Sequence, residues 1–520
     1  MPLSRREFSR LAIAPLAAIS CGGCDTLTTV LMPPLRQKSG HASPELSSAD
    51  RRILDRVTFG STTTLTRRIN EIGASAFLEE QLAPEHLTEN RPLEDQLELL
   101  DTLNMEPSDA RDWERANSQE DIVSVSLKKL IKLPRQTYDP SLGQVANELR
   151  QARILRATYS NRQLLEVMVE FWTDHFNIDL RKDDCAWLKT IDDRQIRQHA
   201  LGNFRDLLSA SVHSPAMLFF LDNAKSRAHN EKPNENYARE LLELHTLGVH
   251  GGYTQKDVQE LARCLSGWSI KSGFTTWPGE ATFRADWHDD QPKLVLGQQI
   301  VTDKNSSEAD QIVDLLSRHP STAFNISRKL CRWFMGEAVP LPIVERVALV
   351  FTKTDGDLRK VLAAIVQSPD FVTVESKKFK RPLDYTISAL RAVDAQTTGI
   401  GVLPYLEKMG QSPYGWPRPD GYPSEVDAWT PGLVYRWNFA IDLVQNKIDG
   451  TIVEPHRVIE RTGQTDPHSI SQALSRAFHS QSLAAADLHE LTLGTKRLAA
   501  DESSACLLAL MLSAPQFQWH

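Results

Sequence analysis

The chain has 520 residues, of which 59 are Lys or Arg and 67 are Asp or Glu, so its formal net charge is −8. Hydrophobic residues make up 41% and charged residues 24%, which is ordinary for a soluble globular protein and excludes a chain that is disordered throughout. The acidic balance argues against a nucleic-acid-binding protein, because such proteins usually carry a basic excess.

Residues 1–21 have the form of a twin-arginine export signal. Arg5 and Arg6 are adjacent, and Phe8 follows two positions later. The apolar run 11–20 is shorter than the roughly 20 residues that span a bilayer, so it predicts a signal that exports the folded protein to the periplasm. Cys21 ends an Ala-Ile-Ser-Cys sequence that resembles a lipobox, which would anchor the protein to the outer membrane. The alternatives are an unlipidated signal and an ordinary N-terminal helix.

Residues 22–47 are predicted to be a flexible tether, because Gly, Pro, Ser and Thr punctuate them. Helical periodicity dominates from residue 48 onward, notably over 119–132, 144–176 and most of 307–513. No second apolar stretch is long enough for a membrane span. These patterns predict a mainly α fold.

Few segments of the chain resemble strands. Residues 294–301 give the clearest run, and 268–285 supply a candidate hairpin beside it. Between residues 254 and 267, Thr254 and Asp257 form a variant of the capping box, which predicts the start of another helix. We therefore expect a small β insertion near 268–302 in an otherwise helical protein.

The segment 234–245 is the densest polar stretch. On an α-helix, Asn236, Glu240 and Glu243 would share one face, with an apolar stripe beside it. Oxygen ligands one turn apart can hold a metal ion, as carboxylates do in helical bundles. The alternative is a solvated face with an Arg239–Glu243 ion pair.

Two further segments supply histidine. His175 follows Phe171 and Trp172 on one helix face, so it is either a buried structural residue or a metal ligand. Glu170 and Asp174, which are four residues apart, lie on the same helix. His288 and Asp289 lie in a loop before the predicted strand. They are candidate metal ligands or acid–base groups, and the alternative is that the loop is only a polar turn.

A long loop at 409–432 is rich in Pro, Tyr and Trp, and ordered loops of this length are often functional. The chain offers no zinc-protease, nucleophile-elbow, P-loop or dinucleotide motif in a usable context. Its chemistry therefore has to be sought in these scattered polar segments.

The run NENYARELLELHTLG at 234–248, followed by GGYTQKDV at 251–258, resembles the signature of the bacterial DUF1800 family. Further stretches that fit are 56–60, 171–176, 215–222, 262–268, 288–289, 380–382, 409–411 and 421–423. The resemblance covers roughly 48–520 and implies one integrated domain, although length alone suggests about three. The chain departs from the family pattern at Asp174 and Ser266, where Asn and Thr are more usual.

The resemblance implies an exported protein without an established activity, often encoded beside an exported DUF1501 protein of alkaline-phosphatase type. Carried over by position, the family motifs fall on these residues: His175, Asn236, Arg239, Glu240, Glu243, Trp268, His288 and Asp289. We therefore expect His175, the 236–243 face and His288/Asp289 to converge on one site.

Our leading hypothesis is a metal-dependent hydrolase or oxidoreductase. His175, His288 and Glu240 would bind Zn, Fe, Mn or Cu, among which ligand type does not decide. Catalysis would use these four residues: Arg239, Glu240, Glu243 and Asp289. Asn236 and Trp268 would contact the cofactor or substrate.

Two hypotheses from other classes stay open. In the first, the protein is a non-catalytic assembly partner of a DUF1501-type protein, with a structural ion-pair network at 236–243 and an aromatic docking surface at 409–432. In the second, it binds or processes glycans, with Glu240 and Asp289 as the acid and the base.

Overall fold

The computed structural model describes residues 46–118, 142–182, 185–228, 231–271, 279–302, 307–373, 377–479, 483–495 and 500–520. The export signal, nearly all of the tether and the helix predicted at 119–132 lie outside these residues. The described part is mainly α-helical, which confirms the predicted fold class. None of its helices is long and apolar enough to cross a membrane.

The helices of the first half are α2 (Ser48–Val57), α3 (Thr63–Leu82), α4 (Arg91–Leu97), α5 (Pro107–Ser118), α7 (Gly143–Tyr159), α8 (Gln163–His175), α9 (Cys185–His199), α10 (Phe204–Val212), α11 (Pro215–Phe220), α12 (Glu235–Glu240), the π-helical segment η5 (Leu241–His245) and α13 (Gln255–Leu265). The predicted run 144–176 is two helices, because the backbone of Ser160 is not helical. Thr254 and Asp257 form the predicted capping box at the start of α13.

The second half contains α14 (Ser307–Ser317), α15 (Pro320–Met335), α16 (Leu341–Lys353), α17 (Leu358–Val366), α18 (Pro369–Thr373), α19 (Pro382–Ala392), α20 (Leu403–Lys408), α21 (Leu433–Val444), α22 (Pro455–Glu460), α23 (Pro467–Phe478), α24 (Ala485–Thr495) and α25 (Ala500–Ser513). Single 3-10 turns connect several of them: η2 (Pro84–His86), η4 (Asn223–Lys225), η6 (Ile400–Val402), η7 (Val426–Ala428), η8 (Thr430–Gly432) and η9 (Pro515–Gln518).

Three antiparallel two-stranded sheets occur in the described residues: β1 (Trp268–Ile270) with β2 (Ala281–Phe283), β3 (Lys293–Val295) with β4 (Gln298–Ile300), and β5 (Gln396–Thr397) with β6 (Thr451–Ile452). The β insertion lies where it was predicted, but the single strand at 294–301 is wrong. Leu296 and Gly297 have φ values of 50° and 76°, so the chain turns there and the run folds back on itself.

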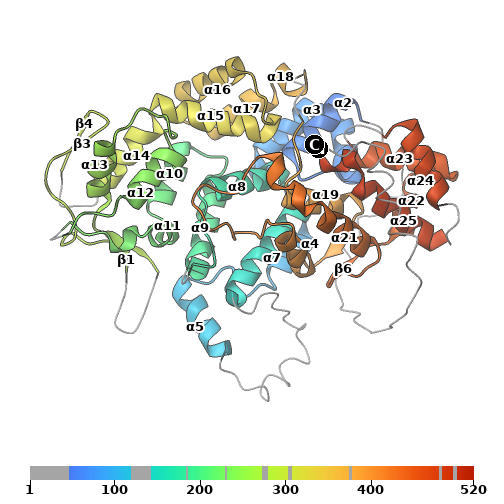
Figure 1. Cartoon of the computed structure of the whole chain (residues 1–520), viewed down its shortest axis with the longest axis horizontal. Coiled ribbons are helices and arrows are strands. Elements are labelled where there is room, and N and C mark those ends of the chain that lie inside the picture. Colours follow the sequence, from blue (N-terminus) through green and yellow to red (C-terminus); the bar gives the residue numbers. More distant parts are fainter. Residues whose placement is uncertain are drawn as a thin grey trace.

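Helices α7, α8, α9 and α19 lie in the middle of the molecule, as Figure 1 shows. Helices α12 to α14 and the first two hairpins lie at one end, and α22 to α25 lie at the other. The chain end returns to the centre, where Trp519 forms a β-bridge with Phe379. The candidate residues of α12, η5 and the β insertion therefore lie at one end of the molecule, and α8 lies in its middle.

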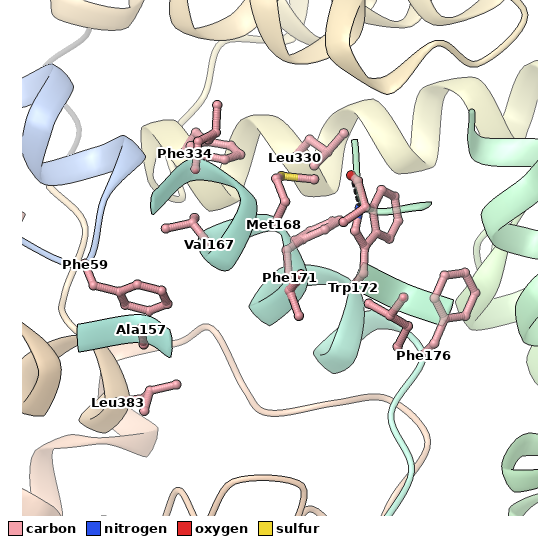
Figure 2. Packing of buried hydrophobic residues seen from close by; sticks show 14 of the residues in the cluster. Phe59, Ala157, Val167, Met168, Phe171, Trp172, Phe176, Leu330, Phe334 and Leu383 are labelled. Carbon is pink, nitrogen blue, oxygen red and sulfur yellow. Dashed lines mark hydrogen bonds between the residues drawn. The ribbon is translucent and has the colours of Figure 1, made fainter. Parts of the chain in front are cut away.

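Helix α8 is embedded in the main hydrophobic core, which extends from Ile53 to Phe517 (Figure 2). Its Phe171 and Trp172 pack edge to face at 4.7 Å, and the Trp172 indole donates a hydrogen bond to the Ala200 carbonyl at 3.0 Å. Because close-packed aromatic groups fix a helix in position, the last turn of α8 presents Asp174 and His175 in a defined orientation.

Candidate functional site

The segment that carries the strongest sequence signal ends in a π-helical turn. Asn234 caps α12 by accepting a hydrogen bond from the Asn236 amide at 2.9 Å, and the helix then widens into η5. The hydroxyl of Thr246 donates to the Leu241 carbonyl at 2.6 Å and closes the turn. The prediction assumed a regular α-helix here. A π-helical turn shifts the side chains that follow it, and such turns are frequent at functional sites.

Side chains from α8 and α15 form hydrogen bonds with the carbonyl groups at the end of η5. The His175 Nε2 lies 3.1 Å from the His245 carbonyl oxygen. The Lys329 ammonium donates to the Leu244 carbonyl at 3.0 Å and to His175 Nδ1 at 3.1 Å. The two nitrogen atoms of His175 are thus a donor and an acceptor in one network. We call His175, His245 and Lys329 the η5 cluster.

Burial keeps both histidines of the η5 cluster neutral. The pKa of His175 lies well below its usual value because the ring is buried and the charge of Lys329 is close. Burial and Lys329 also lower the pKa of His245 to about 3. The prediction that His175 lies on a buried aromatic face is confirmed, since its ring lies 4.5 Å from that of Phe176 and 6.0 Å from that of Phe171.

Lys329 was not predicted, because it lies beside Arg328 in an amphipathic helix and resembles a surface lysine. Burial lowers its pKa to about 8, against the opposing influence of Asp174 and Asp420. At neutral pH an amine of this kind is deprotonated far more often than an exposed lysine.

Glu240 ends α12 and Glu243 lies in η5, and both are half-buried. Burial raises the pKa of the half-buried Glu240, and the charges of Glu243 and Asp420 raise it further against the opposing effect of Arg239. The predicted Arg239–Glu243 pair is present at 3.7 Å, and Arg239 also pairs with Glu235 at 3.2 Å. Asp420 acts electrostatically on both Glu240 and Lys329, so the 409–432 loop reaches the same region.

Behind His175, a buried ion network connects α8 to that loop. Arg381 pairs with Glu170 at 3.1 Å and with Asp174 at 2.8 Å, and Arg153 pairs with Glu170 from the other side. A cavity of about 20 Å³ lies among Arg153, Glu170, Thr173 and other residues, which is room for a single water molecule. We interpret this network as the support of the site, since the cavity is too small for a substrate.

The aromatic loop at 409–432 covers this network instead of projecting into solvent. Tyr414 and Trp429 are buried, and the rings of Trp416 and Tyr422 lie 5.0 Å apart in a half-buried position. The amide of Tyr422 donates to Asp174 at 2.7 Å, and the side chain of Asn177 donates to the Trp416 carbonyl at 2.8 Å. Both bonds hold the loop against the end of α8.

His288 and Asp289 have a separate set of neighbours. His288 Nδ1 lies 2.7 Å from the Ser266 carbonyl oxygen, and Nε2 lies 3.3 Å from a carboxylate oxygen of the buried Glu308. Arg263 holds Asp289 with two hydrogen bonds of 2.6 and 3.1 Å. Burial tends to raise the pKa of Asp289, but these bonds bring it below its usual value.

The other two predicted residues also make local contacts. The ring of Trp268 packs against that of His213 at 4.5 Å, next to the β1–β2 hairpin. The side-chain amide of Asn236 donates to the Leu221 carbonyl at 3.3 Å. Neither residue contacts the η5 cluster in the part of the chain that the structure describes.

The predicted ligand set does not fit a metal ion in this arrangement. Among the described residues, no three His, Cys, Asp or Glu side chains form a group that could hold one. Both nitrogens of His175 are engaged by protein groups, whereas a ligand histidine must offer a free lone pair. What the structure does bring together is the η5 cluster. Asp420 acts electrostatically on Lys329 of this cluster and also on Glu240, whose neighbour Glu243 acts on it as well.

Comparison with protein families identifies a match over nearly the whole chain. The model of the DUF1800 family, which is described as a protein of unknown function, matches residues 52–519. No curated protein and no solved structure matches the chain. The match covers the elements that build the site described above.

Proposed function

The chain belongs to the DUF1800 family, and we propose that it is an exported acid–base enzyme of the hydrolase type. Its proton-transferring groups are Glu240 and Lys329. The observation that carries the proposal is a pair of opposite pKa shifts. The pKa of the Glu240 carboxyl is raised and that of the Lys329 amine is lowered, so both move toward neutral pH, and Asp420 acts on both groups.

Such a pair suits hydrolysis. General acid–base catalysis works best when the pKa of the group lies near the working pH, and burial is the usual means of bringing it there. Glu240 holds its proton to a higher pH than an exposed glutamate, whereas Lys329 releases its proton at a lower pH than an exposed lysine. Both residues are half-buried, so neither is fully enclosed in the core.

Replacing Glu240 with Gln is expected to lower the rate of hydrolysis by about 100-fold or more, the usual contribution of a general acid or base. The measurement is a screen of chromogenic esters, phosphoesters and glycosides, followed by rates over pH for each substrate that is cleaved. Glu235→Gln is the matched control, because Glu235 lies on the same helix and pairs with the same Arg239. Equal rates for wild type and Glu240→Gln would contradict the assignment.

The lysine can be tested without a substrate, in the same set of experiments. Because its pKa is about 8, Lys329 should react with an acid anhydride at half-maximal rate near that pH, as followed by peptide mass spectrometry. In urea-unfolded protein the same lysine should titrate near its ordinary value of 10.5. An unshifted titration in the folded protein would remove Lys329 from the proposal.

Export is expected to fail when Arg5 and Arg6 are both replaced by Lys, because the twin-arginine route requires the arginine pair. Cell fractionation would then find the protein in the cytoplasm. Cys21→Ser separates the two forms of the signal: it should release the protein from the membrane fraction if Cys21 is lipidated. Normal periplasmic delivery of the double-lysine variant would refute this route.

A second candidate function is favoured by the ion pairs of Arg239, which have the form of the structural network expected for an assembly partner. Val434 and Tyr435 are exposed apolar residues directly after the 409–432 loop. Co-purification of a DUF1501-type protein, lost on Tyr435→Glu but not on Glu240→Gln, would favour this function. The glycan hypothesis has less support, because Asp289 is held by Arg263.

A further inference from the structure

A second cavity, of about 320 Å³, lies outside the site described so far. It is lined by the first turn of α3, the turn between α7 and α8, the end of α19 and Arg461. This volume is in the range of pockets that hold small molecules. Thr, Asn, Ser and Gln side chains make up much of its wall, so the ligand it suits is polar.

A buried cation lies at the wall of this cavity. Arg391 is 6% exposed, and it donates to the carbonyls of Gly60 at 2.9 Å and Thr158 at 2.6 Å. Among the described residues no carboxylate forms an ion pair with it. Asp394 also lines the cavity and its charge favours the charged form of Arg391, but Asp394 is exposed and paired with Arg461 at 2.8 Å.

Burial lowers the pKa of Arg391 to about 9, which reflects the cost of holding a guanidinium away from water without a counterion. Buried charges in proteins are normally paired, because an isolated one is expensive. An anion in the cavity would supply the missing partner.

The start of α3 adds positive potential at the same place. Thr62, Thr63, Thr64 and Leu65 line the cavity, and the first turn of α3 contains no acidic residue. The amide groups of a helix N-terminus point outward and favour negative charge. Arg461 also lines the cavity and has donors beyond the one that it gives to Asp394.

We propose that this cavity binds a small organic anion, a carboxylate or a phosphate ester, with its charged group between Arg391 and the first turn of α3. Asn90, Ser160 and Gln396 line the remaining wall and suit the hydroxyl groups of such a molecule. The site is independent of the Glu240–Lys329 pair, so the two proposals stand or fall separately.

The test is calorimetric titration of the full mature chain with citrate and with glycerol 3-phosphate, each at an ionic strength held constant with chloride. Saturable binding of one molecule per chain is expected for at least one of them. Citrate alone would identify a carboxylate site, and glycerol 3-phosphate alone a phosphate site. Absence of binding by both at millimolar concentration would overturn the proposal.

Because Arg391 also holds two backbone carbonyls, its variants risk failing to fold, and Thr64→Glu is the better test. An acidic residue in the first turn suits the helix but places a carboxylate in the anion site. We expect the Kd to rise at least about 10-fold. Asn70→Glu, an exposed position further along the same helix, is the matched control and should leave the Kd unchanged. Equal affinity in Thr64→Glu and wild type would also overturn the proposal.

Discussion

Replacing Arg381 with Ala is expected to lower the free energy of unfolding by about 3–5 kcal/mol, the usual cost of removing one partner from a buried ion pair. Arg381 is buried and pairs with Glu170 at 3.1 Å and with Asp174 at 2.8 Å. Glu170 would keep its pairing with Arg153, whereas Asp174 would lose its cation. Urea unfolding of both proteins at neutral pH measures the difference.

The pH dependence identifies the cause. Burial already raises the pKa of Asp174, and loss of Arg381 removes the main influence that lowers it. A carboxyl whose pKa is higher in the folded protein than in the unfolded chain binds more protons when folded, so falling pH favours folding. The deficit of Arg381→Ala should therefore shrink as the pH falls from about 7 to about 5.

Arg318→Ala is the matched control, because Arg318 pairs with Asp355 at 3.0 Å while both side chains are exposed. An exposed pair contributes about 1 kcal/mol or less. If both variants lost the same stability, or if the deficit of Arg381→Ala grew at low pH, the buried network would not have the supporting role given to it here.

The Arg381 network also marks the limit of prediction from one sequence. The spacing of Glu170 and Asp174 along a helix was evident, but their partner lies 207 residues beyond Asp174. The same holds for His175, whose burial followed from its aromatic neighbours while its partner Lys329 lies 154 residues away. Local periodicity predicts faces of helices, but it contains no information on which distant face lies opposite.

The local errors have a physical cause as well. The strand predicted at 294–301 satisfied the strand pattern, but the Leu296–Gly297 pair can adopt the left-handed conformation that a tight turn needs. The π-helical turn at Leu241–His245 has no signature in composition or periodicity. Convergence of His288 with His175 was expected from the family motifs carried over by position, and the structure gives His288 its own acceptors, Ser266 and Glu308.

Replacing Gly421 with Ala is expected to cost about 3 kcal/mol and to loosen the 409–432 loop from α8. Gly421 has φ of 76°, and a Cβ atom there would lie 2.3 Å from the Asp174 carbonyl oxygen. The left-handed conformation costs about 1–2 kcal/mol for a residue with a side chain, and overpacking adds about 1–3 kcal/mol. Because that oxygen belongs to the backbone, the loop has to move, which weakens the hydrogen bond from Tyr422 to Asp174.

Gly410→Ala separates the cost of backbone strain from the cost of the close contact. Gly410 lies in the same loop and has φ of 89°, but the nearest atom to an added Cβ there, a ring atom of Trp429, is 4.0 Å away. We expect about 1–2 kcal/mol for this variant, from conformational strain alone. Urea unfolding gives both values, and the anhydride labelling of Lys329 gives a local readout. If loop contact keeps Lys329 buried, Gly421→Ala should move its titration from about 8 toward 10.5, whereas Gly410→Ala should not. Equal effects of the two substitutions would show that the loop does not depend on the close approach of Gly421 to α8.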